Sequence, residues 1–265
     1  MPADAFVADP PSIPDPLEAA RALQIAESSQ GFVPLFTDTI PALTWQQARA
    51  IARARDDLRR QNGEQLIGFK LGWTSSAMRK ALGIDQPNWG TLWDSQLLDS
   101  TLDRSVRRHP KIEPELVYVA GARLDGDSTI NDVRSGAAGW AVGLEVVDPR
   151  FADFGFRWLD NTADNSSAGG IARSPTVPPP ETDPTTWQLH FEHGNDQRVG
   201  SGDVVMGSPE AAVLWLAHQL AAESEAIEPG MIVFTGGVVA PFNATTGAYR
   251  AVSPDLGAEV TLEVV

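Results

Sequence analysis

Three glutamates in two short segments are the residues of this chain best suited to chemistry. Glu113 and Glu115 lie in KIEPE (111–115), and Glu145 lies in GLEVVD (143–148). In an extended strand, side chains at i and i+2 point to the same face, so Glu113 and Glu115 converge. Converging like charges are costly unless a cation lies between them. Three carboxylates form the all-oxygen ligand set that Mg²⁺ or Mn²⁺ prefers, and we expect these glutamates to bind one such ion.

A second interpretation of the Glu-x-Glu pair is a solvent-facing strand edge. Glutamate is usually a surface residue, and Pro114 has no backbone N–H, which argues against a central position in a sheet. Glu145 favours the metal site instead, because it interrupts a nearly continuous apolar run over 140–147 that is typical of a buried strand. A buried glutamate requires a partner.

A lysine and a polar cluster are the next candidates. Lys70 lies in GFKLGWTSS (68–76) and is either an edge lysine that prevents sheet pairing or a proton carrier. Near a metal and an apolar wall its pKa would be lowered, which suits acid–base work. The cluster ADNSSAGG (163–170) is either a polar turn or a set of donors for a carboxylate.

Composition excludes several classes of function. The chain has 265 residues and a formal net charge of −15, which argues against nucleic acid as a partner. No apolar run approaches about 18 residues, so no membrane span is predicted. Cysteine is absent, which excludes disulfides and zinc–thiolate sites. The acidic, proline-rich N-terminus lacks the features of a secretory signal, and we expect a cytoplasmic enzyme.

The pattern along the chain predicts the elements that position these residues. Residues 1–16 read as a flexible lead, followed by a helical N-terminal region over 17–65 with helices at 17–29 and 45–61. Thr44 and Gln47 form a capping-box pattern that opens the second helix. Beyond residue 66, short apolar runs bounded by Gly, Pro and Asp predict a mixed-β catalytic domain over 66–265. Strands are expected at 66–71, 116–120, 140–147, 204–206, 231–235 and 259–265, a helix capped by Ser208 at 209–222, and a rigid loop at 174–186.

Seven segments in one order resemble a known enzyme group. They are GFKLGWTSS, QPNWGTLWDS, KIEPELVYV, GLEVVDPRF, TADNSSAGG, GSPEAAVLWLAHQLA and IVFTGG. Together they resemble the 2-keto-4-pentenoate hydratase and 4-oxalocrotonate decarboxylase group of the fumarylacetoacetate hydrolase superfamily, from about residue 17 to the C-terminus. The resemblance implies an α+β fold, a mixed β-sandwich or roll with a small helical N-terminal region. It also implies Mg²⁺ or Mn²⁺ bound by Glu113, Glu115 and Glu145, and acid–base work by Lys70.

The same resemblance implies a metal-dependent lyase that hydrates a 2-hydroxy-2,4-dienoate, a small anionic 2-oxo acid being the substrate. Trp73, Thr74, Asn165 and Ser166 are then candidates for substrate binding. The alternatives are a decarboxylase, or a tautomerase or cyclase acting on a related 2-oxo acid, or a non-catalytic partner subunit. The family also implies a homo-oligomer that can associate with a related hydratase or decarboxylase.

The chain departs from the family pattern near the predicted site. Trp73 stands where members usually carry leucine, and Thr235-Gly236-Gly237 matches its turn only loosely. Ser95 takes the place of an aspartate with a proton-transfer role, and Asp94 lies one position earlier. We therefore expect an altered proton relay, with Asp94 and Ser95 as catalytic candidates. A diacid substrate would need a second cationic contact, for which Arg79, Arg150 and Arg157 are candidates.

Overall fold

Helices form the first part of the chain in the computed structural model, which describes residues 15–265. They are α1 (Pro16–Ser29), α2 (Phe36–Thr39) and α3 (Trp45–Gln61). Asp15 caps α1, so this helix begins one residue before its predicted start, and residues 1–14 of the predicted lead lie outside the described residues. The predicted capping box of Thr44 and Gln47 is confirmed. α1 and α3 pack on α6 (Trp158–Ala163) through an apolar cluster that includes Leu23 and Ile51.

A mixed seven-stranded sheet carries the candidate residues. Along the sheet the order is β2-β1-β9-β4-β5-β6, and β10 also pairs with β4. β1 and β9 are parallel, whereas the other pairs are antiparallel. The strands are β1 (Leu66–Gly72), β2 (Asn88–Trp93), β4 (Lys111–Ala120), β5 (Ala137–Val147), β6 (Ala168–Arg173), β9 (Ile232–Gly237) and β10 (Phe242–Asn243).

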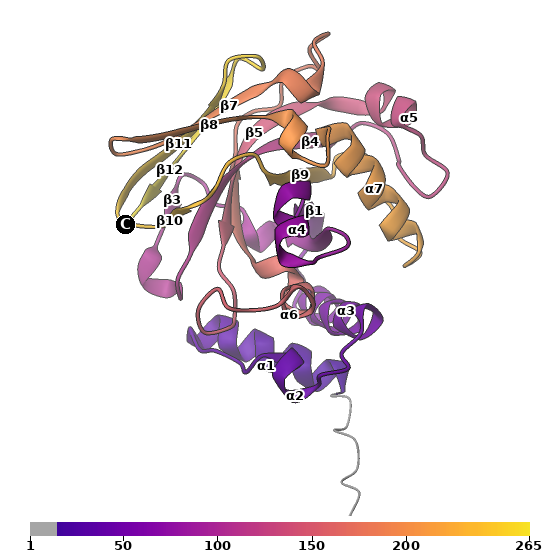
Figure 1. The fold of residues 1–265 in the computed structure, drawn as a ribbon, viewed down its shortest axis with the longest axis vertical. Helices are drawn as coiled ribbons and strands as arrows, with labels where there is room; N and C mark the ends of the chain where they lie inside the picture. Colours follow the sequence, from indigo (N-terminus) through magenta and orange to yellow (C-terminus); the bar gives the residue numbers. More distant parts are fainter. Residues whose placement is uncertain (1–14) are drawn as a thin grey trace, which may run out of the picture.

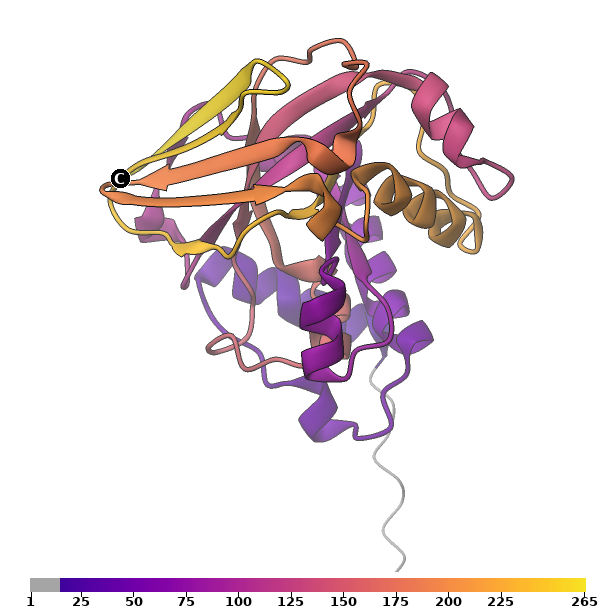
Figure 2. The same ribbon diagram turned by 45° about the horizontal axis from the view of Figure 1, so that its top comes forward.

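A smaller five-stranded sheet packs against the first. Its order is β3-β12-β11-β7-β8, and β12 alternates buried and exposed side chains, so that one face meets the core. Figures 1 and 2 show this sheet on one side of the molecule and α1–α3 at the other end. The strands are β3 (Thr101–Leu102), β7 (Gln188–His193), β8 (Asp196–Ser201), β11 (Gly247–Ser253) and β12 (Ala258–Val264).

Short helices complete the fold. As predicted, Ser208 caps the helix α7 (Pro209–Ala221). α7 lies beside β9, and α5 (Ile130–Ser135) packs on α7. α4 (Ser76–Leu82) follows β1, and the 3-10 turns are η1 (Asp94–Gln96), η2 (Arg104–Val106), η3 (Asn165–Ser167), η4 (Pro184–Thr186) and η5 (Gly202–Val204). Within residues 15–265, none of the helices has the length and apolar character needed to cross a membrane. The predicted α+β class is confirmed.

Two local predictions differ from the structure. The strand predicted at 204–206 is wrong, because residues 202–204 form η5 and only Val205 makes a single bridge, to Ser75. Pro114 lies in a central strand, contrary to the edge interpretation. Its missing N–H is tolerated there because β10 pairs with β4 at residues 111–112 and β9 pairs from Glu115 onward, which leaves Pro114 between the two partners.

Candidate metal centre and active-site cavity

The structure brings the three predicted glutamates together on one face of the larger sheet. β4 and β5 are antiparallel neighbours that place Glu113 directly opposite Glu145, and Glu115 follows two residues along β4. One carboxylate oxygen from each residue lies within 4.8 Å of the others. Glu115 and Glu145 are fully buried, and Glu113 is half-buried. The convergence of the three carboxylates predicted from their spacing is confirmed.

Lys70 adds the cationic side chain of this cluster. Its strand β1 lies between β2 and β9, so Lys70 is not an edge lysine. The ammonium Nζ lies 3.0 Å from Glu145 Oε1 and donates to the carbonyl oxygen (2.9 Å) and the hydroxyl (3.0 Å) of Ser166. With all four groups ionised the cluster carries a net charge of −2, which matches one divalent cation.

Several oxygens of the cluster lack hydrogen bonds. The Gly236 N–H donates to Glu115 Oε2 at 2.7 Å, but Glu115 Oε1 and both oxygens of Glu145 have no hydrogen-bond donor among the described residues, the Lys70 contact being an ion pair without hydrogen-bond geometry. Leaving a buried acceptor unpaired costs about 1–3 kcal/mol. The unpaired oxygens of Glu115 and Glu145, with the carboxylate of Glu113 beside them, fit a hard divalent cation such as Mg²⁺ or Mn²⁺, which takes oxygen ligands.

Without a cation the carboxylates resist ionisation. Burial and then the charge of Glu145 raise the pKa of Glu113 to about 7 and raise the pKa of Glu115 well above its usual range. Burial alone would lower the pKa of Lys70, but the nearby Glu145 and Glu115 outweigh it and raise that pKa. The predicted lowering of the Lys70 pKa is therefore not found in the protein alone, because the lysine faces carboxylates from both β4 and β5.

Ser166 meets Lys70 through an unusual turn. Asn165, Ser166 and Ser167 have φ values of 54°, 51° and 58°, three consecutive left-handed residues that are not glycine. Such backbone is sparsely populated and persists only when the surroundings hold it. Asn165 supplies part of that support, since its Oδ1 accepts from the Thr91 N–H (2.7 Å) and its Nδ2 donates to the Thr91 carbonyl (2.9 Å). Both ends of the Asn165 amide are thus engaged with Thr91, and its role in substrate binding stays a prediction.

A cavity of about 430 Å³ opens beside the cluster. Lys70, Glu113 and Ser166 line its polar side, and Trp73 and Thr74 lie on the wall where the sequence predicted substrate contacts. The Trp73 residue has a φ of 59°, and its indole Nε1–H donates to the Asn161 Oδ1 at 2.9 Å. The remaining wall is largely apolar and includes Met78, Val147, Phe154, Phe156, Val238 and Val239.

Gly236 has a steric reason to be glycine. Its φ is 112°, and a Cβ there would lie 2.1 Å from the hydroxyl oxygen of Thr74. Because Gly236 has no side chain, β9 can lie directly against Thr74 while the backbone N–H of Gly236 donates to Glu115. The loosely matched turn at residues 235–237 therefore still supports the cluster.

Two functional candidates escaped the sequence reasoning. Asn88 on β2 is fully buried, and its Oδ1 accepts from the Ser166 hydroxyl at 3.0 Å. Its Nδ2 donates to Asn161 Oδ1 at 2.7 Å, so Asn88 and Asn161 link Trp73 to Ser166. A local pattern could have indicated Asn88, because it begins NWGTLW, a strand rich in apolar residues, much as Glu145 interrupts its own apolar run.

Asp94 and Ser95 do not reach this cavity, which corrects their predicted catalytic roles. Both are exposed on η1, where the chain leaves β2 after Trp93. Asp94 accepts from the Gln65 N–H at 3.0 Å, and the Ser95 hydroxyl donates to the Glu64 carboxylate. Ser95 lines a different cavity of about 290 Å³. The altered proton relay inferred from Ser95 consequently has no basis in the geometry.

Comparisons with known proteins agree with this fold. No family model matches the chain. A 2-keto-4-pentenoate hydratase of Burkholderia vietnamiensis is 33% identical over 90% of this chain and 93% of its own length. A 4-oxalocrotonate decarboxylase of Pseudomonas sp. (strain CF600) is 30% identical over 87% of this chain and 89% of its own.

Solved structures extend the comparison. The 4-oxalocrotonate decarboxylase from Pseudomonas putida G7, complexed with magnesium and adipate, superimposes with a TM-score of 0.89 and 27% identity over 94% of this chain and 97% of that one. A putative fumarylacetoacetate hydrolase family protein from Yersinia pestis shares the fold alone, with a TM-score of 0.58 and 16% identity over 74% of this chain and 92% of that one. The fold is thus that of the fumarylacetoacetate hydrolase superfamily. Within it, the chain belongs to the family of 2-keto-4-pentenoate hydratases and 4-oxalocrotonate decarboxylases.

Proposed function

We propose that this protein is a metal-dependent lyase that adds water to a 2-hydroxy-2,4-dienoate. The observation that carries the proposal is the buried carboxylate cluster, Glu113, Glu115 and Glu145, with unmet oxygens beside Lys70 and an adjoining cavity. Similarity to hydratases over nine-tenths of the chain supports the same reaction class.

The three glutamates hold Mg²⁺ or Mn²⁺ in this proposal. The net charge of −2 favours a dication, and the similar decarboxylase structure is described as complexed with magnesium. When bound, such an ion supplies Lewis-acid polarisation of the 2-oxo acid, drawing electron density toward the keto oxygen.

The proton movements fall to Lys70. In the reaction the 2-hydroxyl proton leaves and C5 gains a proton, which gives a 2-oxo-3-enoate. Water then adds across the conjugated double bond, the hydroxyl to C4 and a proton to C3, for a net gain of one water. Lys70 Nζ is held by the carbonyl and hydroxyl oxygens of Ser166 and lines the cavity, which is why these proton transfers are assigned to it. Asn88 fixes the Ser166 hydroxyl in turn.

The cavity walls suit a small planar acid. Trp73, Phe154 and Phe156 provide flat apolar surfaces, and Thr74, which also lines the cavity, is assigned as a donor for the substrate carboxylate. Trp73 is held by Asn161 and therefore narrows the cavity with a fixed ring.

The direct test is an assay with the purified protein, Mg²⁺ and 2-hydroxypenta-2,4-dienoate. We expect loss of the dienol absorbance and a product heavier by one water, stopped by EDTA and restored by excess Mg²⁺. Protein that binds Mg²⁺ yet leaves this substrate and its homologues unchanged would overturn the proposal.

Decarboxylation is the second candidate, favoured by the TM-score of 0.89 to a decarboxylase. The same electron sink accepts the electron pair left by departing CO₂ from a vinylogous 2-oxo diacid. Adding 4-oxalocrotonate to the assay and measuring CO₂ separates the two reactions. A tautomerase or cyclase would change the absorbance without gain of water or loss of CO₂, and a non-catalytic partner subunit would bind Mg²⁺ without any turnover.

We further propose that the chain forms a homo-oligomer. Met78 and Leu82 on α4 are one helical turn apart and 48% and 58% exposed, which provides an apolar strip for a neighbouring subunit. Light scattering coupled to gel filtration measures the mass of the assembly directly. The same experiment with an added related decarboxylase or hydratase tests mixed association.

A further inference from the structure

Lys111 is the least explained charged residue of the active-site cavity. It lies two residues before Glu113 on β4, on the same face, and lines the cavity. Its side chain is half-buried, and its ammonium lies 3.8 Å from the ring centroid of Phe154. Among residues 15–265 this ammonium has no carboxylate within 4.0 Å and no hydrogen bond, and its charge acts only at longer range, to lower the pKa of Glu113.

The other cations proposed for a second carboxylate lie elsewhere. Arg79 donates to the carbonyl oxygens of Trp73 and Thr74, which fixes the backbone after β1. Arg150 is fully buried against Asp164, and Arg157 pairs with Asp38 on the surface. Within the described chain, Lys70 and Lys111 are the cationic side chains that line the cavity, and Lys70 is committed to Glu145 and Ser166.

We infer that Lys111 binds a second carboxylate, so that the substrate is a 2-oxo or 2-hydroxy-dienoic diacid. This inference rests on the proposed function, which places the 2-oxo acid end at the three glutamates. Residues at i and i+2 in a strand are about 7 Å apart, which fits a diacid with a few carbons between its two ends. A carboxylate at Lys111 would form a charge-assisted hydrogen bond within a largely apolar wall, where such bonds are strong.

The same contact bears on the type of reaction. An ammonium that holds the far carboxylate stabilises its negative charge in the ground state. Loss of CO₂ requires that charge to move into the carbon skeleton, so the contact opposes decarboxylation at that end. Lys111 therefore favours hydration of a diacid, with the far carboxylate retained in the product.

Two non-reacting ligands of equal chain length provide the test. We would titrate 2-oxoadipate and 2-oxohexanoate, which differ in the second carboxylate, into protein saturated with Mg²⁺ and measure affinity by calorimetry. We expect 2-oxoadipate to bind at least tenfold tighter to the natural protein. Lys111→Met should reduce the ratio of affinities to about one, and Lys111→Arg should preserve most of it.

Each alternative outcome is separable. Equal affinity of the two ligands for the natural protein would overturn the diacid inference and leave the proposed function intact. Equal weakening of both ligands in Lys111→Met would also overturn it, because Lys111 would then act on the shared 2-oxo acid end. If neither ligand bound to the metal-loaded protein, the proposed function would fail as well. Circular dichroism and the Mg²⁺ affinity of Lys111→Met confirm that the variant folds and loads.

Discussion

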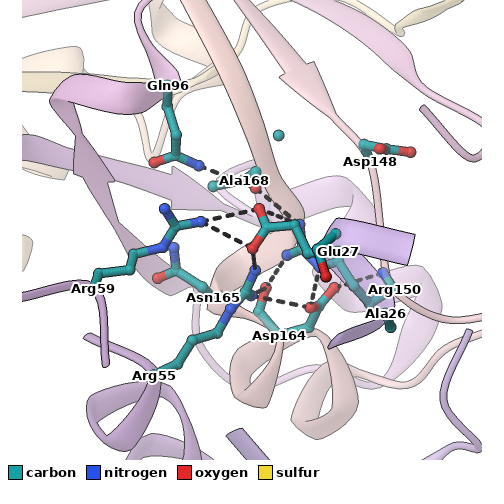
Figure 3. Close-up of polar contacts among 12 residues, drawn as sticks. Ala26, Glu27, Arg55, Arg59, Gln96, Asp148, Arg150, Asp164, Asn165 and Ala168 are labelled. Atoms are coloured by element: carbon teal, nitrogen blue, oxygen red, sulfur yellow. Dashed lines mark hydrogen bonds and ion pairs between the residues drawn. The ribbon is translucent and has the colours of Figure 1, made fainter. Parts of the chain in front are cut away.

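Two buried clusters of charged residues in this molecule differ in the sign of their excess charge. The carboxylate cluster has three glutamates and one lysine, whereas the arginine cluster joins α1, α3 and the segment around α6 (Figure 3). In the arginine cluster each acid meets at least two guanidinium groups. Its members are Glu27, Arg55, Arg59, Arg150 and Asp164.

The contacts of the arginine cluster satisfy its acids. Glu27 accepts from Arg55 Nη2 at 2.6 Å and from Arg59 Nη2 at 2.9 Å. Asp164 Oδ1 accepts from Arg150 Nε at 2.5 Å, and its Oδ2 accepts from the Arg150 backbone N–H at 3.0 Å. Burial would raise the pKa of Glu27, but the three arginines outweigh burial and hold it far below its usual range.

The comparison shows that burial alone does not identify a binding site. Both clusters are largely buried, yet only the carboxylate cluster keeps acceptors without donors and raises the pKa of its acids, first through burial and then through neighbouring glutamates. The arginine cluster is a structural link, because it attaches the N-terminal helices to Asp164, one residue before the strained turn that carries Ser166. Four predictions test this division.

The largest effect is expected for Glu145→Gln. The change removes one of three charged ligands and leaves a neutral amide of similar size, so Mg²⁺ affinity should fall at least 100-fold in calorimetry. Glu27→Gln is the matched control, since it removes a carboxylate from the other cluster and should leave Mg²⁺ affinity within about threefold of normal. Unchanged Mg²⁺ binding in Glu145→Gln would rule out its role as a ligand.

Lys70→Met separates metal binding from proton transfer within the carboxylate cluster. General acid–base groups contribute about 10²–10⁴-fold to rate, and we expect a loss of kcat in that range. Mg²⁺ should bind at least as tightly as before, because a competing positive charge 3.0 Å from Glu145 is gone. The two measurements are stopped-flow loss of the dienol and calorimetric titration. A normal kcat would remove Lys70 from the mechanism.

Glu27→Gln should act on stability alone. It leaves Arg55, which is 2% exposed, without its closest anion, and breaking a buried ion pair costs about 3–5 kcal/mol. Because the Glu27 side chain is 26% exposed, we expect the lower end, a loss of about 3 kcal/mol in the free energy of unfolding. Denaturant titration measures this change. A stability equal to that of the natural protein would show that the arginine cluster is not a structural link.

The contrast also explains what local sequence could predict. Glu113 and Glu145 were identifiable because strand periodicity and an interrupted apolar run are local patterns. Asn88 and Lys111 were missed because their roles depend on which strands and loops meet at the cavity, which is set by non-local pairing. Ser95 was misplaced because one turn of 3-10 helix after Trp93 carries it away from the cavity.

Helix starts could be predicted from neighbouring residues, whereas one strand could not. The capping box at Thr44 and the cap at Ser208 marked two helix starts correctly, since capping uses neighbouring residues only. The strand predicted at 204–206 failed, because Val204 ends η5 and is exposed, and Val205 makes only one bridge, to Ser75. Whether an apolar run becomes a strand depends on its pairing partner, and that partner is distant in the sequence.

The smallest effect is expected at Asp56, a buried acid in neither cluster. It accepts from the Thr91 hydroxyl at 2.6 Å, and burial raises its pKa from 3.8 to about 6. Since the folded state holds this proton more tightly than the unfolded state, Asp56 weakens the fold as the pH rises from about 4 through 6, and the penalty is complete above that range. Two pKa units correspond to about 3 kcal/mol.

Asp56→Asn should remove that penalty while keeping a side-chain oxygen for Thr91. We expect it to raise the free energy of unfolding by about 1–3 kcal/mol at pH 8 and to have little effect at pH 4, as measured by denaturant titration at both values. The gain should be independent of Mg²⁺, because Asp56 is not a member of the carboxylate cluster. A gain that appears only with Mg²⁺ present would show that the carboxylate cluster extends to α3 and that the division between the two clusters is incomplete.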